Sequence, residues 1–570
     1  MALSVSATPQ PDSSTLTEGQ AAGRGAWLAL TAALLGWMFD GAEMGVFSLV
    51  GRPALKDLMS REEAFAALAG ADLERHVALW LGVITAVFLV GAATGGVLFG
   101  WLGDRIGRVR AMTLSVLCYA VFTSLCGIAA SPLQLGVFRF IASLGMGGEW
   151  SLGVALVMEV WPNRSRAFMA GLIGAAANVG YLMVAIVGLG LSTLLVHVQQ
   201  GMLDAGVSQA WVDHLTANQG WRLMMILGIA PALLTFFIRL FVPESSKWQE
   251  EKESGSTSHW ATQDLIGVFI GALGPGLLVY LYAFPSTGSF EHTMTVRLVA
   301  TVLGVLLAVV GYTYPVLRYL QRLHAAQPAG TPSEAGPTIR RMLLAACLSG
   351  VALLGTWGGT QQAPAWADKL VDPPKPSPAA SLPDGPPGGG AQAATVTAAN
   401  PAPRPHAKEF TLIWLSIGAI VGTIGAALAG DWLGRRKAYF LLCLLSFGSV
   451  VLLFQFNRHY GNMLLFSAFV AGTFTASFYG WLPLYLPELF RTNVRATGQG
   501  FGFNFGRILA AVGSFQLGAL VAAFEGGLTV GPITLAGGYP SACTILSTVY
   551  AVGMVLIWFA PETRGQPLPD

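Results

Sequence analysis

The chain has 570 residues, of which 54% are hydrophobic and only 11% are charged, and its mean hydropathy is +0.59. Soluble domains carry roughly 25% charged residues, so this composition excludes an ordinary soluble enzyme and indicates an all-α polytopic membrane protein. The formal net charge of +2 gives no indication of a nucleic-acid partner. The five cysteines stand in apolar segments without Cys-x-x-Cys spacing, which predicts neither a disulfide framework nor a metal site.

The first part of the chain predicts six membrane spans after a polar tail. Residues 1–26 lack the apolar core of a signal peptide, so we expect a tail that is retained. A spanning helix needs about 20 mostly apolar residues. Six segments satisfy this, at 27–50, 79–101, 111–130, 133–160, 167–191 and 221–241. A polar, amphipathic segment is expected at 51–76, and a long loop after the fifth span.

Two extra apolar segments, 265–284 and 296–317, separate this group from a second group of six. The second group lies at 342–362, 410–430, 438–456, 462–484, 498–524 and 539–559, which brings the count to fourteen. Residues 372–406 are rich in Pro, Gly and Ala and predict a disordered external loop. We therefore expect a tail at 1–26, a six-helix bundle at 27–243, a linker with two extra helices at 244–341, a second bundle at 342–560 and a tail at 561–570.

One charged loop pattern occurs in both groups. Aligning GWLGDRIGRVR at 100–110 with ALAGDWLGRRK at 427–437 places Asp104 on Asp431. Internal repeats of this kind are typical of transporters built from two related halves. Each copy follows an apolar span, so we expect a conformational latch between helix ends, in which glycines permit a tight turn and arginines pair with the aspartate. The predicted latch residues are Gly100, Asp104, Arg105, Gly107, Arg108, Asp431, Gly434, Arg435 and Arg436.

The first copy, G-x-L-x-D-R-x-G-R, resembles the hallmark loop of the major facilitator superfamily, which lies between the second and third helices and again, degenerated, between the eighth and ninth. The resemblance implies two six-helix bundles that rock about a central cavity, here with an inserted helix pair. Arginine and lysine in the short loops gather on one predicted side, and such an excess marks the cytoplasmic side. We therefore expect both termini in the cytoplasm and the protein in the plasma (inner) membrane.

Ionisable residues within the predicted spans are candidate working groups, because each costs roughly 2.5 to 3.5 kcal/mol at mid-bilayer on insertion scales. Asp40 lies about 20 Å along the first span and Glu43 one turn further. Arg139, six residues into the fourth span, lies at nearly the same depth as Asp40, so an ion pair is feasible. We predict that Asp40, Glu43, Arg139 and Glu149 couple transport to protons. The alternative is that Asp40 and Arg139 form a permanent structural pair.

Arg507 is the candidate for binding a substrate carboxylate, because it lies about 15 Å deep in its span and offers planar, bidentate donors. Asn504, one turn away, could assist. The alternative is that Arg507 pairs with a carboxylate such as Glu149. Polar and aromatic side chains in the other spans complete the predicted substrate site, namely Asn178, Trp357, Gln361, Tyr479 and Trp481.

Longer motifs narrow the resemblance. RFIASLGMGGEW at 139–150 and the segment at 485–507 resemble sialate and related organic-acid proton symporters, and FDGAE at 39–43 is similar to a motif of the aromatic-acid symporters, with Glu43 in place of a second aspartate. These resemblances imply a monomeric transporter, without cofactor, that moves a small organic acid together with protons through membrane lipid. PESSKW at 243–248 and PETRG at 561–565 resemble sugar porters, so a sugar or polyol porter is an alternative, and a non-transporting solute sensor is another.

Overall fold

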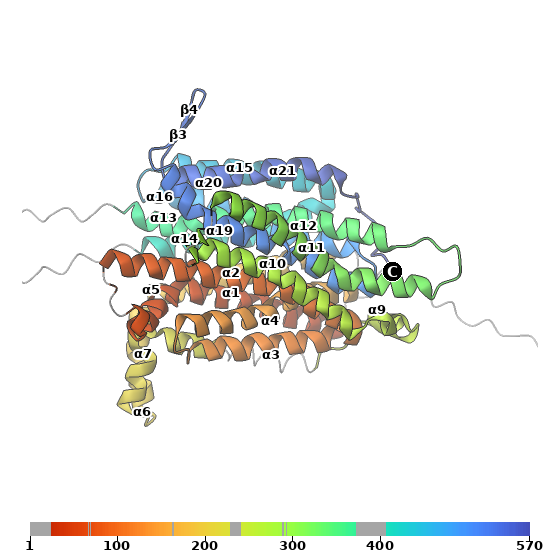
Figure 1. Ribbon diagram of the computed structural model, residues 1–570, viewed down its shortest axis with the longest axis horizontal. Coiled ribbons are helices and arrows are strands. Elements are labelled where there is room, and N and C mark those ends of the chain that lie inside the picture. The colour runs from red at the N-terminus through yellow and green to blue at the C-terminus, as the bar shows by residue number, and fades with distance from the viewer. Residues whose placement is uncertain are drawn as a thin grey trace, which may run out of the picture.

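The computed structural model describes residues 24–65, 68, 70–161, 165–228, 241–284, 286–287, 290–291, 293–371 and 406–570. Its long helices run side by side in one bundle (Figure 1). Most of the predicted N-terminal tail and of the predicted external loop at 372–406 lie outside these residues. The all-α class predicted from composition is confirmed, since the described strands form only two short hairpins.

We use "N-terminal half" for the first seven helices and "C-terminal half" for those from α12 onward. The N-terminal half comprises α1 (Arg24–Ser60), α2 (Gly70–Ile106), α3 (Arg108–Cys126), α4 (Pro132–Val160), α5 (Arg166–Leu189), α6 (Leu191–Asp204) and α7 (Gln209–Leu227). Between the halves lie α9 (Ser246–Glu253), α10 (Leu265–Ala283), the strands β1 (Ser286–Thr287) and β2 (Phe290–Glu291), and α11 (Met294–Ala325).

The C-terminal half is built from shorter helical pieces. They are α12 (Ala335–Gly358), the 3-10 turn η5 (Thr360–Gln362), α13 (Ala363–Lys369), α14 (Ala407–Leu433), α15 (Arg435–Gln455), α16 (Asn462–Thr475), α17 (Phe478–Tyr485), α18 (Arg495–Asn504), α19 (Gly506–Ala523), β3 (Leu528–Val530), β4 (Ile533–Leu535), α20 (Tyr539–Ser547) and α21 (Val549–Leu556). Gly359, with φ −114° and ψ −86°, interrupts the first of these helices.

Thirteen stretches among the described residues are long and apolar enough to cross a membrane. The sixth predicted span, 221–241, begins in α7, and its residues 229–240 lie outside the part of the chain that the structure describes. The two extra spans are observed as α10 and α11, and every other predicted span coincides with a described helix or helix pair.

The segment 51–76, predicted as a separate polar stretch, is mostly a continuation of the first two helices. α1 passes through Pro53 and ends at Ser60, and α2 begins at Gly70. The reason is burial: Leu55 and Leu58, on the inner face of α1, are completely covered by the bundle. The apolar face that made the segment amphipathic therefore extends the helix instead of ending it.

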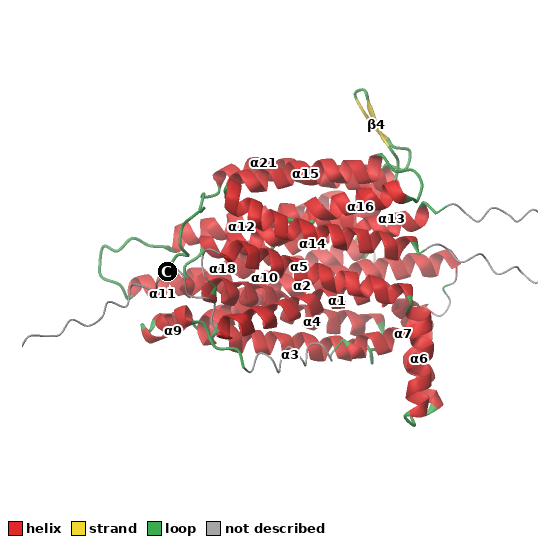
Figure 2. Cartoon of the chain, turned by 180° about the vertical axis from the view of Figure 1, so that it is seen from behind, coloured by secondary structure: helices red, strands yellow, loops and turns green. Residues whose placement is uncertain are grey.

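The long loop predicted after the fifth span is largely helical. α6 and the first part of α7 form a hairpin that projects sideways from one end of the bundle (Figures 1 and 2). Within α7, Asn218 and Gln219 have positive φ angles of 51° and 64°. Asp57 of α1 holds this bend, because its carboxylate accepts hydrogen bonds from Asn218 at 2.8 Å and from Arg222 at 3.2 Å. Short-range periodicity could not reveal a bend that depends on a residue 160 positions away.

The two halves meet along two seams. On one, α5 packs against α14 and α17; on the other, α2 packs against α18 and α19. The second seam allows very close backbone approach, because a Cβ added at Gly500 would overlap the carbonyl of Gly96. α10 and α11 lie over this seam on the outside of the bundle.

Candidate functional site

A cavity of about 100 Å³ lies between the halves, in the middle of the bundle. α1, α4 and α5 supply one wall, and α12, η5, α17, α18 and α19 supply the other. Its polar lining consists of Asp40, Asn178, Tyr181, Thr356, Gln361, Tyr479 and Arg507, and its aromatic lining adds Trp37, Trp150, Trp357 and Phe503. The arrangement combines one acid and one cation with flat apolar surfaces, which suits a small, partly apolar anion.

Arg507 lies at the start of α19, and its side chain is only 7% exposed. Its guanidinium lies over the ring of Phe503, 5.6 Å from the centroid. Among the described residues, the buried Nε and Nη1 atoms of Arg507 have no hydrogen-bond partner. Buried cations are normally paired, so these donors are available to a carboxylate that enters the cavity.

Asp40 reaches the same cavity from α1, in the opposite half. The next residue, Gly41, lies so close to α5 that an added Cβ would overlap the carbonyl of Ala177. Asn178 of α5 lines the same cavity, and its amide donates to the Gly174 carbonyl at 3.0 Å. Asp40 and Arg507 therefore line one cavity, Asp40 from the N-terminal half and Arg507 from the C-terminal half.

Arg139 donates to Glu43, and both side chains are buried. The guanidinium lies between the rings of Phe47 and Phe88, at 4.3 and 4.4 Å from their centroids. None of these four residues lines the cavity. Arg139 thus pairs with Glu43 and not with Asp40, one turn away. This pair joins α1 to α4 within the N-terminal half.

Three other predicted site residues lie outside the cavity lining. Glu149 is fully buried in α4, one turn beyond Gly145, which packs against α3. Asn504 donates to the Gly147 carbonyl at 3.1 Å, so its amide joins α18 to α4. Trp481 packs between Tyr439 and Tyr485 inside the C-terminal half. The structure therefore places Asn504 and Trp481, predicted to bind substrate, and Glu149, predicted to couple protons, outside the cavity lining.

An aromatic stack closes one side of the cavity. Trp150 of α4 and Phe503 of α18 are parallel within 6°, with ring centroids 3.8 Å apart, and Trp37 also stacks with Trp150, at 5.7 Å between centroids. Beyond this stack, Gln499 of α18 donates to the Ser151 carbonyl of α4. The halves are therefore in direct contact from the cavity to the end of the molecule that carries the latch, which we call the latch end.

The first latch copy joins the halves. Asp104, at the end of α2, accepts hydrogen bonds from Ala496 N at 3.2 Å, from Thr497 N at 2.9 Å and from Thr497 Oγ1 at 2.6 Å. It also pairs with Arg108 at 3.0 Å. Because these donors are the free N–H groups that begin α18, the carboxylate also favours the positive end of that helix.

Arg108 extends the latch to a second carboxylate. It pairs with Glu159 at 3.1 Å, and Arg495 of the other half reaches the same oxygen at 2.9 Å. Glu244, in the Pro-Glu-Ser motif after the sixth predicted span, accepts from the backbone N–H of Arg108 at 2.9 Å and of Val109 at 3.1 Å. Through these two bonds the Pro-Glu-Ser motif caps the N-terminus of α3. Burial raises the pKa of Glu244.

The second latch copy repeats these contacts inside the C-terminal half. Arg435 binds Glu488 with two donors, at 2.6 and 3.0 Å, and Glu562 of the Pro-Glu-Thr motif accepts from Arg435 N at 2.9 Å. Burial opposes ionisation of Glu562, yet its backbone donors hold its pKa below the ordinary value. Asp431 pairs with Arg435 at 3.3 Å, but its side chain is 56% exposed. The second copy therefore keeps a glutamate that caps the following helix, but its aspartate does not join the two halves as Asp104 does.

Details of the latch differ from expectation. The turn between α2 and α3 uses a single glycine, Gly107, with φ 111°, and Gly434 repeats it with φ 92°. Gly100 and Gly103 lie inside α2, where Gly100 allows close approach, because an added Cβ would lie 2.7 Å from the Ala496 carbonyl oxygen. Arg105 donates to Thr262 at 2.7 Å instead of to Asp104. Arg436 donates to the Ala560 carbonyl at 2.6 Å.

Sequence reasoning missed several cavity residues. Tyr181 lies three positions after Asn178, and Trp37 three positions before Asp40, so helical spacing places each pair on nearly one face. Phe503 and Trp150 stand next to residues that the sequence singled out. Helical spacing from the polar candidates would have found Trp37, Tyr181 and Phe503, which lies four positions before Arg507. It would not have found Trp150, because adjacent residues of a helix point in different directions, nor the stacking between halves.

Comparison with known proteins agrees with this architecture. Residues 28–267 match the family described as sugar (and other) transporter. A Haemophilus influenzae protein named for metabolite transport is 25% identical over 543 residues, which cover 95% of this chain and 98% of that protein. The cis,cis-muconate transport protein of Acinetobacter baylyi is 33% identical over 30% of this chain and 36% of its own. The sialic acid transporter NanX of Escherichia coli is 27% identical over 39% and 45%.

The proton:xylose symporter XylE of Escherichia coli has a similar fold, with a TM-score of 0.59 over 95% of this chain and 97% of that chain, at 16% sequence identity. Two related helical halves around a central cavity, together with these relatives, define a polytopic membrane transporter and not an enzyme. The family match, these relatives and the fold of XylE all support a transporter of the major facilitator type, as the latch motif predicted.

Proposed function

We propose that the protein imports a small organic acid together with protons, by alternating exposure of the central cavity. The observation that carries this proposal is Arg507, a buried cation that lines the cavity and whose Nε and Nη1 donors have no hydrogen-bond partner among the described residues. Once Asp40 is protonated, a neutral sugar would leave that charge uncompensated, whereas a carboxylate would neutralise it and could accept two hydrogen bonds.

The shape of the cavity supports a small substrate. A volume of about 100 Å³ is of the same order as the cavities that hold one aromatic ring. Flat surfaces from Trp357, Tyr479 and Phe503 lie near Arg507 in the lining. A conjugated or cyclic acid could stack on such a surface while its carboxylate meets Arg507. Relatives named for the transport of cis,cis-muconate and sialic acid are consistent with an acidic substrate.

Asp40 is the group that we assign to the proton. A charged Asp40 and a bound carboxylate would repel each other across the cavity, and both would compete for Arg507. Protonation of Asp40 removes this competition, so that proton and anion favour each other's binding. Glu43 and Arg139 then serve to hold α1 against α4, beside Asp40. Substrate and proton would reach the cytoplasm when the latch end opens. In this proposal the protein lies in the plasma membrane with both termini in the cytoplasm, and it works as a monomer.

The experiment is uptake by purified protein in liposomes with an imposed proton gradient, using cis,cis-muconate, sialic acid and xylose as separate probes. Accumulation of an acid that depends on the gradient and is lost in Arg507→Gln supports the proposal. Gln361→Ala, which changes a neutral residue of the same lining, is the matched control and should retain part of the uptake.

Two other results would reject the proposal. The match to sugar transporters makes a sugar porter the second candidate, and xylose accumulation that is insensitive to Arg507→Gln would favour it. Binding of an acid, detected by thermal shift, without any accumulation would indicate a sensor.

A further inference from the structure

The inserted helices α10 and α11 form one tightly joined hairpin. Gly274 lies directly against the Gly304 backbone, and Gly311 against the Gly271 backbone, so that an added Cβ would overlap the opposite chain. Close approach through small residues is a strong mode of helix packing in membranes. The pair can therefore move as one body.

The hairpin lies at the edge of the bundle. On α10, Ile266, Phe269, Leu273 and Leu277 are exposed at helical spacing, whereas the opposite face, including Leu278, is buried. The exposed face has the composition of a surface in contact with lipid. The buried face covers the seam between α2 of the N-terminal half and α19 of the C-terminal half.

Directed polar contacts fasten the insert to the N-terminal half. Tyr312 of α11 shares a hydrogen bond of 2.8 Å with Thr94 of α2, and both side chains are buried. At the latch end, Arg105 of α2 donates to Thr262, just before α10, at 2.7 Å. The buried bond between Tyr312 and Thr94 has little water to replace it when broken. The two attachments, at Thr94 and Arg105, lie about three turns apart on α2 and hold the insert along that helix.

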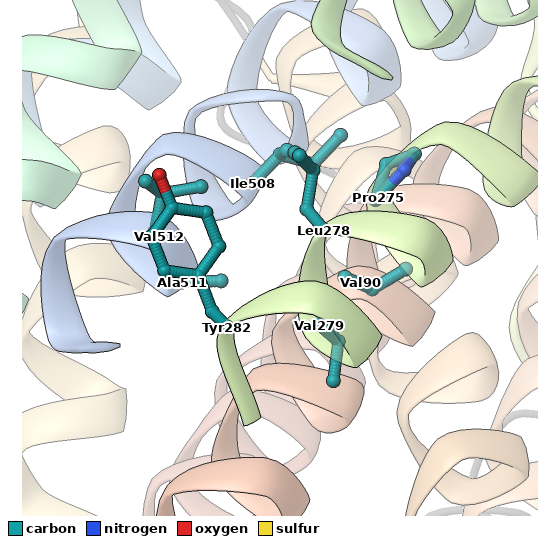
Figure 3. Close-up of a pocket in the computed structure, with 8 residues that line it drawn as sticks. All are labelled: Val90, Pro275, Leu278, Val279, Tyr282, Ile508, Ala511 and Val512. Atoms are coloured by element: carbon teal, nitrogen blue, oxygen red, sulfur yellow. The ribbon is translucent and has the colours of Figure 1, made fainter. Parts of the chain in front are cut away.

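The contact with the C-terminal half is of a different kind. Leu278 of α10 packs with Val512 of α19, and Figure 3 shows Tyr282 turned toward Ala511 and Val512, with Ile508 near Leu278. A small void of about 10 Å³ remains between α10, α19 and Val90 of α2. Apolar contacts are non-directional, so this surface can be displaced along α19 at low cost.

We propose that α10 and α11 travel with the N-terminal half and slide over α19 when the two halves rock, keeping the α2–α19 seam covered. The insert thus acts as a mobile cover that is hydrogen-bonded to α2 of the N-terminal half and packs against α12, α18 and α19 of the C-terminal half. This inference rests on the alternating access of the proposed function, and not on the identity of the substrate or on the proton.

Two disulfides test the proposal, in a background in which the five native cysteines are replaced by alanine. Leu278→Cys with Val512→Cys joins α10 to α19, and Val90→Cys with Val279→Cys joins α10 to α2, both across the same void (Figure 3). A reporter, Ala476→Cys, lines the central cavity. An impermeant maleimide is added on the side of the membrane that faces the latch end, in vesicles prepared in either orientation. The rate at which it labels the reporter measures how often the cavity opens at the latch end, and no substrate is needed.

We expect the α10–α19 disulfide to lower reporter labelling by about tenfold or more, and reduction to restore it. The α10–α2 disulfide is the matched control and should leave labelling within about twofold. Inhibition by the α10–α2 disulfide, or free labelling with α10 joined to α19, would overturn the proposal. Absence of labelling in the reporter protein without any disulfide would contradict alternating access itself, and so both proposals.

Discussion

Replacing Asp104 by asparagine should open the latch end. The carboxylate accepts three hydrogen bonds from Ala496 and Thr497 in the other half. Hydrogen bonds to a charged group contribute about 1.5–3 kcal/mol each, against about 0.5–1.5 for neutral ones. Asparagine keeps one acceptor oxygen and turns an NH2 group toward the remaining donors. We therefore expect a loss of about 3 kcal/mol, which shifts the conformational equilibrium by roughly a hundredfold toward the state open at the latch end.

The assay is maleimide labelling of the cavity reporter Ala476→Cys from the latch end, together with substrate binding by thermal shift. Asp104→Asn should speed labelling and slow transport, while binding changes less. Asp431→Asn is the matched control, because Asp431 occupies the repeated position, is 56% exposed and pairs with Arg435 of its own half. Equal labelling rates in Asp104→Asn, Asp431→Asn and the parent protein would refute the argument that the first copy holds the halves together.

Three further predictions address other contacts. Phe503→Ala removes the ring stacked on Trp150 and should also speed labelling from the latch end, with Phe503→Leu intermediate; unchanged labelling would exclude the stack as a closure. Asp57→Ala leaves Arg222 without its carboxylate and should lower stability by about 3 kcal/mol or more, measured as a lower melting temperature. Backbone donors hold the pKa of Glu562 below its ordinary value, so its stabilisation is present at neutral pH and lost as pH falls through the folded pKa. Glu562→Gln should therefore flatten the acid side of the melting-temperature profile.

The sequence was sufficient for the latch and the helices because both depend on local pattern. Residues spaced as Asp104, Gly107 and Arg108 define a helix end wherever they occur, and runs of about 20 apolar residues leave little choice but a span. The repeat also predicted two related halves. It could not predict that Asp431 is exposed, because exposure depends on which copy faces the other half.

The site was only partly predictable, since depth along a helix says nothing of direction around it. Asp40 and Glu43 lie one turn apart, and Arg139 at similar depth could reach either; the packing of α1 against α4 decides for Glu43. Asn504 has the right depth beside Arg507 but faces α4. The sequence predicted a loop in place of the hairpin of α6 and α7, because the bend of this hairpin depends on Asp57, which is far away in the chain.

The most direct test of the account is transport by Asp40→Asn in liposomes, measured as uptake of the accepted acid with and without a proton gradient and as exchange of labelled for unlabelled acid. Asparagine resembles the protonated side chain but cannot titrate. We predict a stably folded variant that binds and exchanges the acid and no longer accumulates it when the gradient is imposed. Gradient-driven accumulation equal to that of the parent protein would contradict Asp40 as the coupling group, and with it the proposed competition for Arg507.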